Sequence, residues 1–166
     1  RASGAEIVPF SPLADEAPAG DADAIFLPGG YPELHLPRLS TASRFLNGLR
    51  DAASKSVRIY GECGGFMTLG QRIIDKDGAA FSMARLLDLE TSFAARKLHL
   101  GYLQVAARQG GWPGTAPLTA HEFHYTTATS ATGDPLFDAV TPSGKPLGPM
   151  GLVNGTVSGS YAHIIA

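Results

Sequence analysis

The N-terminal half of the chain alternates short apolar runs with one longer amphipathic segment. Residues 5–9 and 24–27 are short apolar stretches that each predict a strand, and the second is continuous enough to be covered on both faces. Across residues 37–53 the apolar positions recur at steps of three and four, which predicts one buried helix face. A further buried strand is expected to end at Tyr60. This alternation is typical of a parallel α/β sheet.

The pattern changes after the polar turn at residues 75–78. Shorter strand-like pieces follow, separated by loops rich in Gly and Pro: residues 98–107, 119–127 and 151–161. Within the last piece, Asn154-Gly155 stands between two apolar pairs and predicts a hairpin. We therefore expect an α/β fold with a mostly parallel sheet and additional antiparallel strands in the C-terminal half.

Two glycine-containing turns follow the predicted parallel strands. The first is Pro28-Gly29-Gly30-Tyr31-Pro32-Glu33, whose glycines can turn backbone N–H groups inward. The second is Gly61-Glu62-Cys63-Gly64-Gly65, with the only cysteine of the chain at its apex. Functional groups of open α/β sheets gather beyond the carboxyl ends of the strands, so both turns are expected at the functional edge. The plainer interpretation of the first turn is an ordinary strand-to-helix connection.

Cys63 stands in the G-x-nucleophile-x-G pattern of a sharp strand-to-helix elbow. At the N-terminus of the following helix, unpaired N–H groups and the helix dipole favour thiolate, the nucleophilic form. Glu62, beside it, is expected to be a solvated side chain or to face a domain interface. The alternative is that Cys63 is a small buried residue near a turn without a chemical role.

A cysteine nucleophile needs a base, and histidine is the usual one because it titrates near neutral pH. Of the five histidines, His35 and His99 lie in segments without other catalytic features. Alternation along residues 121–125 puts Glu122 and His124 on one strand face and His121 on the other, so the two histidines cannot share a metal ion. His121, His124 and His163 remain candidates for the base, and no metal site is expected.

Composition narrows the class of protein. The chain has 166 residues, 44% of them hydrophobic, and a formal net charge of -2, which suits one domain and gives no sign of a nucleic-acid or membrane surface. A single cysteine and the lack of a long apolar run suit a soluble cytoplasmic protein. The chain opens at Arg1 without methionine and stops directly after a strand-like segment, so we expect a piece of a longer protein.

Four motifs in order carry a resemblance to a known family. They are the Gly29-Gly30-Tyr31 turn, the Gly61–Gly65 elbow, His121-Glu122-Phe123-His124-Tyr125, and Gly159-Ser160-Tyr161-Ala162-His163. Together the motifs resemble the class I glutamine amidotransferase domain of cobyrinic acid (hydrogenobyrinic acid) a,c-diamide synthases, over nearly the whole chain. The resemblance implies a flavodoxin-like glutaminase domain without its first strand, fused in the full protein to an ATP- and magnesium-using synthetase domain that binds the corrinoid.

The resemblance also implies roles for individual residues. Cys63 is expected to be the nucleophile and His163 its base. Ile165 stands where many relatives carry a glutamate, so the resemblance leaves the third member of the triad unassigned. Glu122 is our candidate for the supporting carboxylate, and the alternative is that it contacts the substrate. Backbone N–H groups are expected to form the oxyanion hole. The candidates for the oxyanion hole are Gly30 and Gly64. The candidates for substrate binding are Gly29, Tyr31 and His124.

Other expectations concern partners. Glutamine is the expected substrate of this domain, which needs no cofactor of its own, and a homodimer is possible. The alternatives are a related amidotransferase for cobyric acid or nickel-sirohydrochlorin, a cysteine peptidase or γ-glutamyl hydrolase of the same superfold, and a non-catalytic binding domain.

Overall fold

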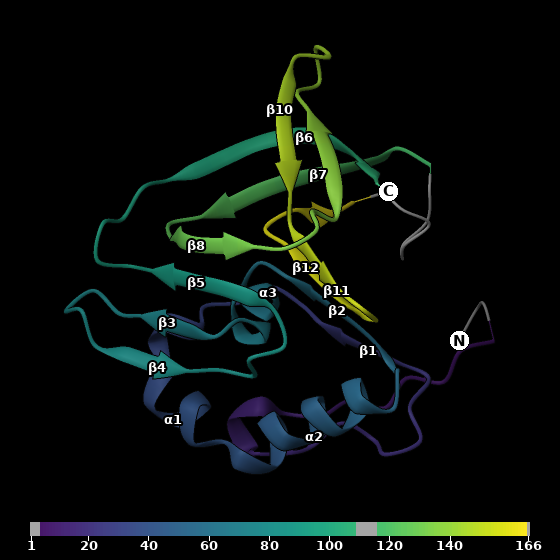
Figure 1. Cartoon of the computed structure of the whole chain (residues 1–166), viewed down its shortest axis with the longest axis vertical. Coiled ribbons are helices and arrows are strands. Elements are labelled where there is room, and N and C mark those ends of the chain that lie inside the picture. Colours follow the sequence, from purple (N-terminus) through teal and green to yellow (C-terminus); the bar gives the residue numbers. More distant parts are fainter. Residues whose placement is uncertain (1–3, 109–115, 166) are drawn as a thin grey trace.

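The chain is built from three small sheets with helices packed beneath the first of them (Figure 1). The computed structural model describes residues 4–108 and 116–165. The positions at which the sequence suggested a cut chain, Arg1 and Ala166, lie outside the described residues. The α/β class expected from the hydrophobic pattern is confirmed.

The first sheet has the strand order β1-β2-β12-β11 and supports both glycine turns. Its strands are β1 (Ala24–Leu27), β2 (Arg58–Glu62), β12 (Val157–Ser160) and β11 (Leu152–Asn154). The pairs β1–β2 and β2–β12 are parallel. Strands β11 and β12 form the hairpin predicted at Asn154-Gly155, with Gly155 at a positive φ of 58° that suits a glycine.

Three helices pack near this sheet: α1 (Leu36–Thr41), α2 (Ser43–Ser54) and α3 (Gly64–Leu69). Two short 3₁₀ turns accompany them, η1 (Pro12–Ala14) and η2 (Pro32–Leu34). The single helix expected over residues 37–53 is interrupted at Ala42, whose backbone is not helical. The reason is a long-range cap: the Asp15 carboxylate accepts a hydrogen bond of 2.9 Å from the Phe45 N–H in the first turn of α2.

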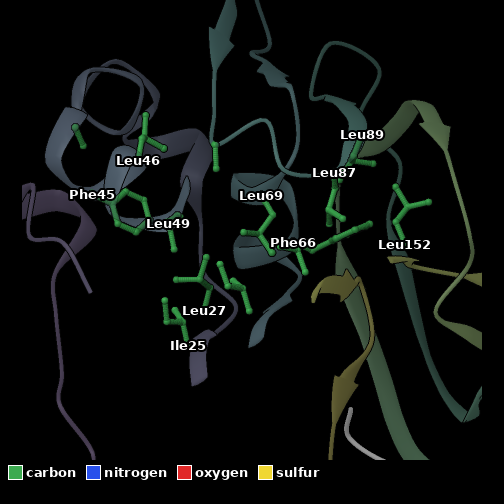
Figure 2. Packing of buried hydrophobic residues seen from close by; sticks show 14 residues of the cluster. Ile25, Leu27, Phe45, Leu46, Leu49, Phe66, Leu69, Leu87, Leu89 and Leu152 are labelled. Carbon is green, nitrogen blue, oxygen red and sulfur yellow. The ribbon is translucent and has the colours of Figure 1, made fainter. Parts of the chain in front are cut away.

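The main hydrophobic core joins α2, α3 and the first sheet. Figure 2 shows Phe45 and Leu49 of α2 facing the side chains of β1 and α3, and each of the two is 0% exposed. Burial of a large apolar side chain stabilises a fold by about 1.5–3 kcal/mol. The packing therefore fixes β1, β2 and α3 relative to one another, and these elements carry the two glycine turns.

The second sheet is antiparallel, in the order β10-β9-β6-β7-β13. Its strands are β10 (Pro146–Met150), β9 (Phe137–Val140), β6 (His99–Ala107), β7 (Leu118–His124) and β13 (His163–Ile164). The pairing of β13 with β7 sets His163 opposite His121. The end of the chain thus returns from the parallel sheet onto the β6–β7 pair.

The third sheet, in the order β4-β3-β5-β8, contains short strands that the hydrophobic pattern did not single out: β3 (Arg72–Ile74), β4 (Ala80–Ser82), β5 (Asp88–Ser92) and β8 (Thr127–Thr132). Among its pairs only β3–β5 is parallel. The parallel part of the fold is consequently smaller than expected, because most strands of the C-terminal half pair with their neighbours in antiparallel fashion.

The strand expected over residues 5–9 is not formed. Within the described residues this segment has no strand pairing, and Ile7 is 74% exposed. A short apolar run becomes a strand only where a neighbouring strand supplies hydrogen bonds.

Candidate active site

Cys63 occupies a strained elbow between β2 and α3. Its φ of 47° and ψ of -104° lie outside the regions favoured by residues with a Cβ. The Cys63 N–H donates to the Ser160 carbonyl at 2.8 Å, and the Cys63 carbonyl accepts from the Met67 N–H at 3.0 Å. The surrounding hydrogen bonds thus hold the backbone in a conformation that costs on the order of 1–3 kcal/mol.

The elbow depends on glycine because backbone segments approach closely. A Cβ on Gly65 would lie 2.2 Å from the Leu27 carbonyl oxygen, and one on Gly61 would lie 2.7 Å from the Gly65 carbonyl carbon. No side chain fits at either position without moving backbone. The two glycines of the G-x-nucleophile-x-G pattern therefore let α3 pack directly on β1 and β2.

The Cys63 thiol lies beneath the second sheet, 5% exposed, with Sγ 3.9 Å from the Phe123 carbonyl oxygen of β7. Burial raises the pKa of this thiol, while hydrogen bonds from the Gly64 and Gly30 backbone N–H groups lower it, and burial has the larger effect. The Gly64 N–H at the helix N-terminus thus favours thiolate, as expected, but burial outweighs it and the net shift of the pKa is upward. The thiol is protonated near neutral pH, and a base must take its proton before it can act as a nucleophile.

The two glycine turns are in direct contact at Gly30 and Gly64. A Cβ on Gly64 would lie 2.8 Å from the Gly30 oxygen and 2.9 Å from its nitrogen. Both backbone N–H groups reach the same sulfur. Two donors that converge on one point are the arrangement expected of an oxyanion hole.

His163 reaches the same turn from the other side of the chain. A Cβ built on Gly29 would lie 2.3 Å from His163 Cε1, so the imidazole rests directly on the Gly29 backbone. Gly29 precedes Gly30, and consecutive Cα atoms are about 3.8 Å apart. The imidazole and the thiol, 100 positions apart in the sequence, therefore both adjoin one glycine pair.

The His163 ring stacks on the His121 ring, with centroids 4.8 Å apart and planes at 13°. Burial lowers the pKa of His163, and the neighbouring His121 and His124 lower it further. A lowered pKa leaves the imidazole neutral at neutral pH. In that form His163 can accept a proton.

The two nearby carboxylates lie beside different histidines. Glu122 Oε1 is 3.4 Å from His124 Nε2, whereas Glu62 Oε2 is 3.9 Å from His163 Nδ1. Glu62 is 9% exposed, so the expectation of a solvated side chain is wrong. Within the described residues no ion pair joins Glu122 to His163. Glu122 was the candidate for the supporting carboxylate, but β13 brings His163 beside Glu62.

His124 lies in a ring stack between two other aromatic side chains. Its ring is 3.9 Å from that of Tyr161 and 4.6 Å from that of His99, and its Nδ1 is 3.0 Å from the Thr126 carbonyl oxygen. A cavity of about 250 Å³ adjoins this stack, and His99, Glu122, His124 and Tyr161 all contribute to its wall. His99 thus belongs to the surroundings of the site, which its sequence context did not indicate.

The remaining substrate-binding candidate, Tyr31, directly follows Gly30 and is 60% exposed. In residues 4–108 and 116–165, no group of three or more His, Cys, Asp and Glu side chains could hold a metal ion. The same part of the chain contains no helix with the length and hydropathy of a membrane span.

Comparison with solved structures defines the class of fold. A glutamine amidotransferase from Thermotoga maritima matches with a TM-score of 0.53 and 17% identity, over 89% of this chain and 58% of that one. A second crystal structure, also titled as a glutamine amidotransferase, matches with a TM-score of 0.52 and 14% identity, over 85% and 70%. The fold is that of the glutamine amidotransferases.

Sequence comparison makes the assignment more specific. The chain belongs to the family of CobB/CobQ-like glutamine amidotransferase domains, whose family model matches residues 1–166. Relatives named hydrogenobyrinate a,c-diamide synthase are 55% identical in Brucella abortus, 49% in a Sinorhizobium species and 46% in Rhodobacter capsulatus. The matches cover 99–100% of this chain but 38% of each relative. The family resemblance drawn from the four motifs is confirmed.

Proposed function

We propose that this domain hydrolyses glutamine through a covalent thioester on Cys63 and releases ammonia for an amidation carried out by the remainder of the full-length protein. The observation that carries the proposal is the convergence at the Gly29–Gly30 turn. There, a buried thiol, two backbone N–H donors and a neutral imidazole gather around one point. These are the parts that acyl transfer to a cysteine requires.

In the first step His163 takes the Cys63 proton as sulfur attacks the side-chain carbonyl carbon of glutamine. The carbonyl oxygen becomes an oxyanion that accepts hydrogen bonds from the Gly30 and Gly64 N–H groups. His163 Nδ1 is the ring nitrogen beside Glu62, which leaves Nε2 for the thiol. The tetrahedral intermediate then collapses, the carbon–nitrogen bond breaks, and the imidazolium protonates the departing ammonia.

In the second step His163 activates a water molecule, which attacks the thioester carbonyl. Glutamate leaves, and the proton returns to the sulfur. A positioned base contributes about 10²- to 10⁴-fold to such a rate, and one oxyanion donor about 3 kcal/mol. The imidazole has to supply the larger share of nucleophile activation because the pKa of the Cys63 thiol is raised.

The relatives' name supports a substrate for the whole protein. We propose that ammonia amidates the a- and c-carboxylates of hydrogenobyrinic or cobyrinic acid in cobalamin biosynthesis. The carboxylates would be activated with ATP and magnesium in a synthetase domain outside this chain. That domain would bind the corrinoid, and the enzyme, a carbon–nitrogen ligase, would act in the cytoplasm. Among the groups at this site, Tyr31, Gly29 and His124 are proposed to contact glutamine.

The test uses the full-length protein carrying Cys63→Ala or His163→Ala. Glutamate release and glutamine-dependent amidation should fall by at least 10³-fold in Cys63→Ala. Amidation driven by added ammonium salt should persist, because it bypasses this domain. Glutamine-dependent amidation that survives Cys63→Ala would show that another residue is the nucleophile.

A further inference from the structure

A buried carboxylate lies beside the nucleophile, on the Nδ1 side of the His163 ring. Glu62 immediately precedes Cys63 and ends strand β2. The residue two positions after His163, Ile165, is 53% exposed and has no polar side-chain group. The only ion pair of His163 within the described residues is therefore the one with Glu62.

The Glu62 carboxylate is fixed from two directions. Oε1 accepts a hydrogen bond of 3.3 Å from the Ile164 N–H, the backbone amide directly after His163. The Tyr60 side chain also interacts with this carboxylate and with the Ser160 side chain. Parallel register sets Glu62 beside Ser160, so β12 delivers the chain to this point. The Glu62 carboxylate is thus hydrogen-bonded to β13, the strand that carries His163.

We infer that Glu62 is a positioning residue for His163: its Oε2 accepts a hydrogen bond from the Nδ1–H of the imidazole and stabilises the imidazolium formed when the thiol gives up its proton. This inference rests on the proposed glutaminase function. It places the supporting carboxylate directly before the nucleophile in the sequence rather than after the histidine. Glu62 and Cys63 lie at the end of β2, and His163 lies at the start of β13.

The recorded separation of 3.9 Å between Oε2 and Nδ1 is longer than a hydrogen bond. A hydrogen bond requires an approach of about 1 Å, and catalytic hydrogen bonds often tighten only when substrate binds. Ring and carboxylate can approach without unfolding β13, because the Ile164 N–H contact already ties the two segments together. Formation of the imidazolium would draw them closer by adding charge attraction in a poorly hydrated site.

Several titratable groups face this carboxylate. His121 and His163 approach it from β7 and β13, Tyr60 lies on its own strand, and Cys63 is its sequence neighbour. Burial raises the pKa of Glu62, while the Ile164 and Tyr60 hydrogen bonds and the His121 charge lower it. The carboxylate is therefore sensitive to the charge of the imidazoles in front of it.

The experiment compares Glu62→Gln with Glu90→Gln in the full-length protein. Glu90 pairs with Arg72 on the third sheet, which gives a matched loss of one paired carboxylate. Glutamine at position 62 keeps an oxygen for the Ile164 N–H but cannot stabilise an imidazolium by charge. We expect kcat for glutamine hydrolysis to fall roughly 10²- to 10³-fold in Glu62→Gln, with KM changed less than about threefold. Glu90→Gln should leave kcat unchanged.

A second readout reports on the histidine itself. Long-range ¹H–¹⁵N spectra of the imidazole rings should show His163 as the Nδ1–H tautomer in the wild type, and a loss of that preference in Glu62→Gln. A kcat within threefold of wild type, or an unchanged tautomer, would overturn the inference. If wild-type protein lacked glutaminase activity, the proposed function would fail, while the tautomer would still decide the role of Glu62.

Discussion

The backbone of Gly29 lies directly against the imidazole of His163, so that a Cβ at position 29 would stand 2.3 Å from Cε1. We predict that Gly29→Ala displaces the ring, because the nearest atoms belong to the end of a side chain that can move. Glutaminase kcat/KM should fall at least tenfold while Tm changes little. The control is Gly20→Ala, where a Cβ meets nothing within 4 Å. Equal activity of the two variants would contradict the placement of His163.

Gly65→Ala, unlike Gly29→Ala, should lower the stability of the protein. Its Cβ would lie 2.2 Å from the Leu27 carbonyl oxygen, so backbone rather than a mobile side chain must give way. We expect a loss of about 1–3 kcal/mol or more in the free energy of unfolding, measured by urea denaturation, since overpacking outweighs the helix propensity of alanine. Gly101→Ala, which has open space, should be neutral or slightly stabilising. A stable Gly65→Ala protein would show that α3 packs less closely on β1.

The strained backbone of Cys63 gives a stability test that is independent of its chemistry. At φ 47° and ψ -104°, alanine retains the steric penalty that glycine avoids. The free energy of unfolding of Cys63→Gly should therefore exceed that of Cys63→Ala by about 1 kcal/mol. Both variants should lack glutaminase activity. The comparison is made by denaturant titration. An alanine variant as stable as the glycine variant would indicate an unstrained elbow.

The pH dependence of glutamine hydrolysis should reflect the environment of His163. Burial, then His121 and His124, lower its pKa, so the neutral base persists to lower pH than a free imidazole. The acid limb of kcat/KM should accordingly lie below the usual pKa of histidine, about 6.5. His121→Phe keeps an aromatic ring in the stack but removes a positive charge. In that variant the acid limb should move to higher pH, and a move to lower pH would contradict the account.

Sequence reasoning reached the features of the site that depend on local geometry. The glycine turns after β1 and β2 and the Asn154-Gly155 hairpin were predictable, because each depends on a few neighbouring residues with special backbone freedom. Alternation along β7 likewise put Glu122 and His124 on one face, and the structure records their contact. The family assignment followed from the order of such motifs.

The features that could not be predicted from the sequence depend on contacts between distant segments. Glu62 is buried because the chain returns at Ile164, and the pKa of the Cys63 thiol is raised because β7 covers it. The break between α1 and α2 results from a cap supplied by Asp15, which lies before β1 in the chain. No periodicity of nearby residues encodes these three relationships.

The central claim is that Cys63 is the nucleophile and His163 its base. It is tested most directly by treating the full-length protein with a chloroketone analogue of glutamine and locating the adduct by peptide mass spectrometry. We predict stoichiometric labelling of Cys63, blocked by excess glutamine, and at least 10²-fold slower labelling in His163→Ala because the thiol is protonated without its base. Labelling of another residue, or an equal rate without the imidazole, would contradict the account.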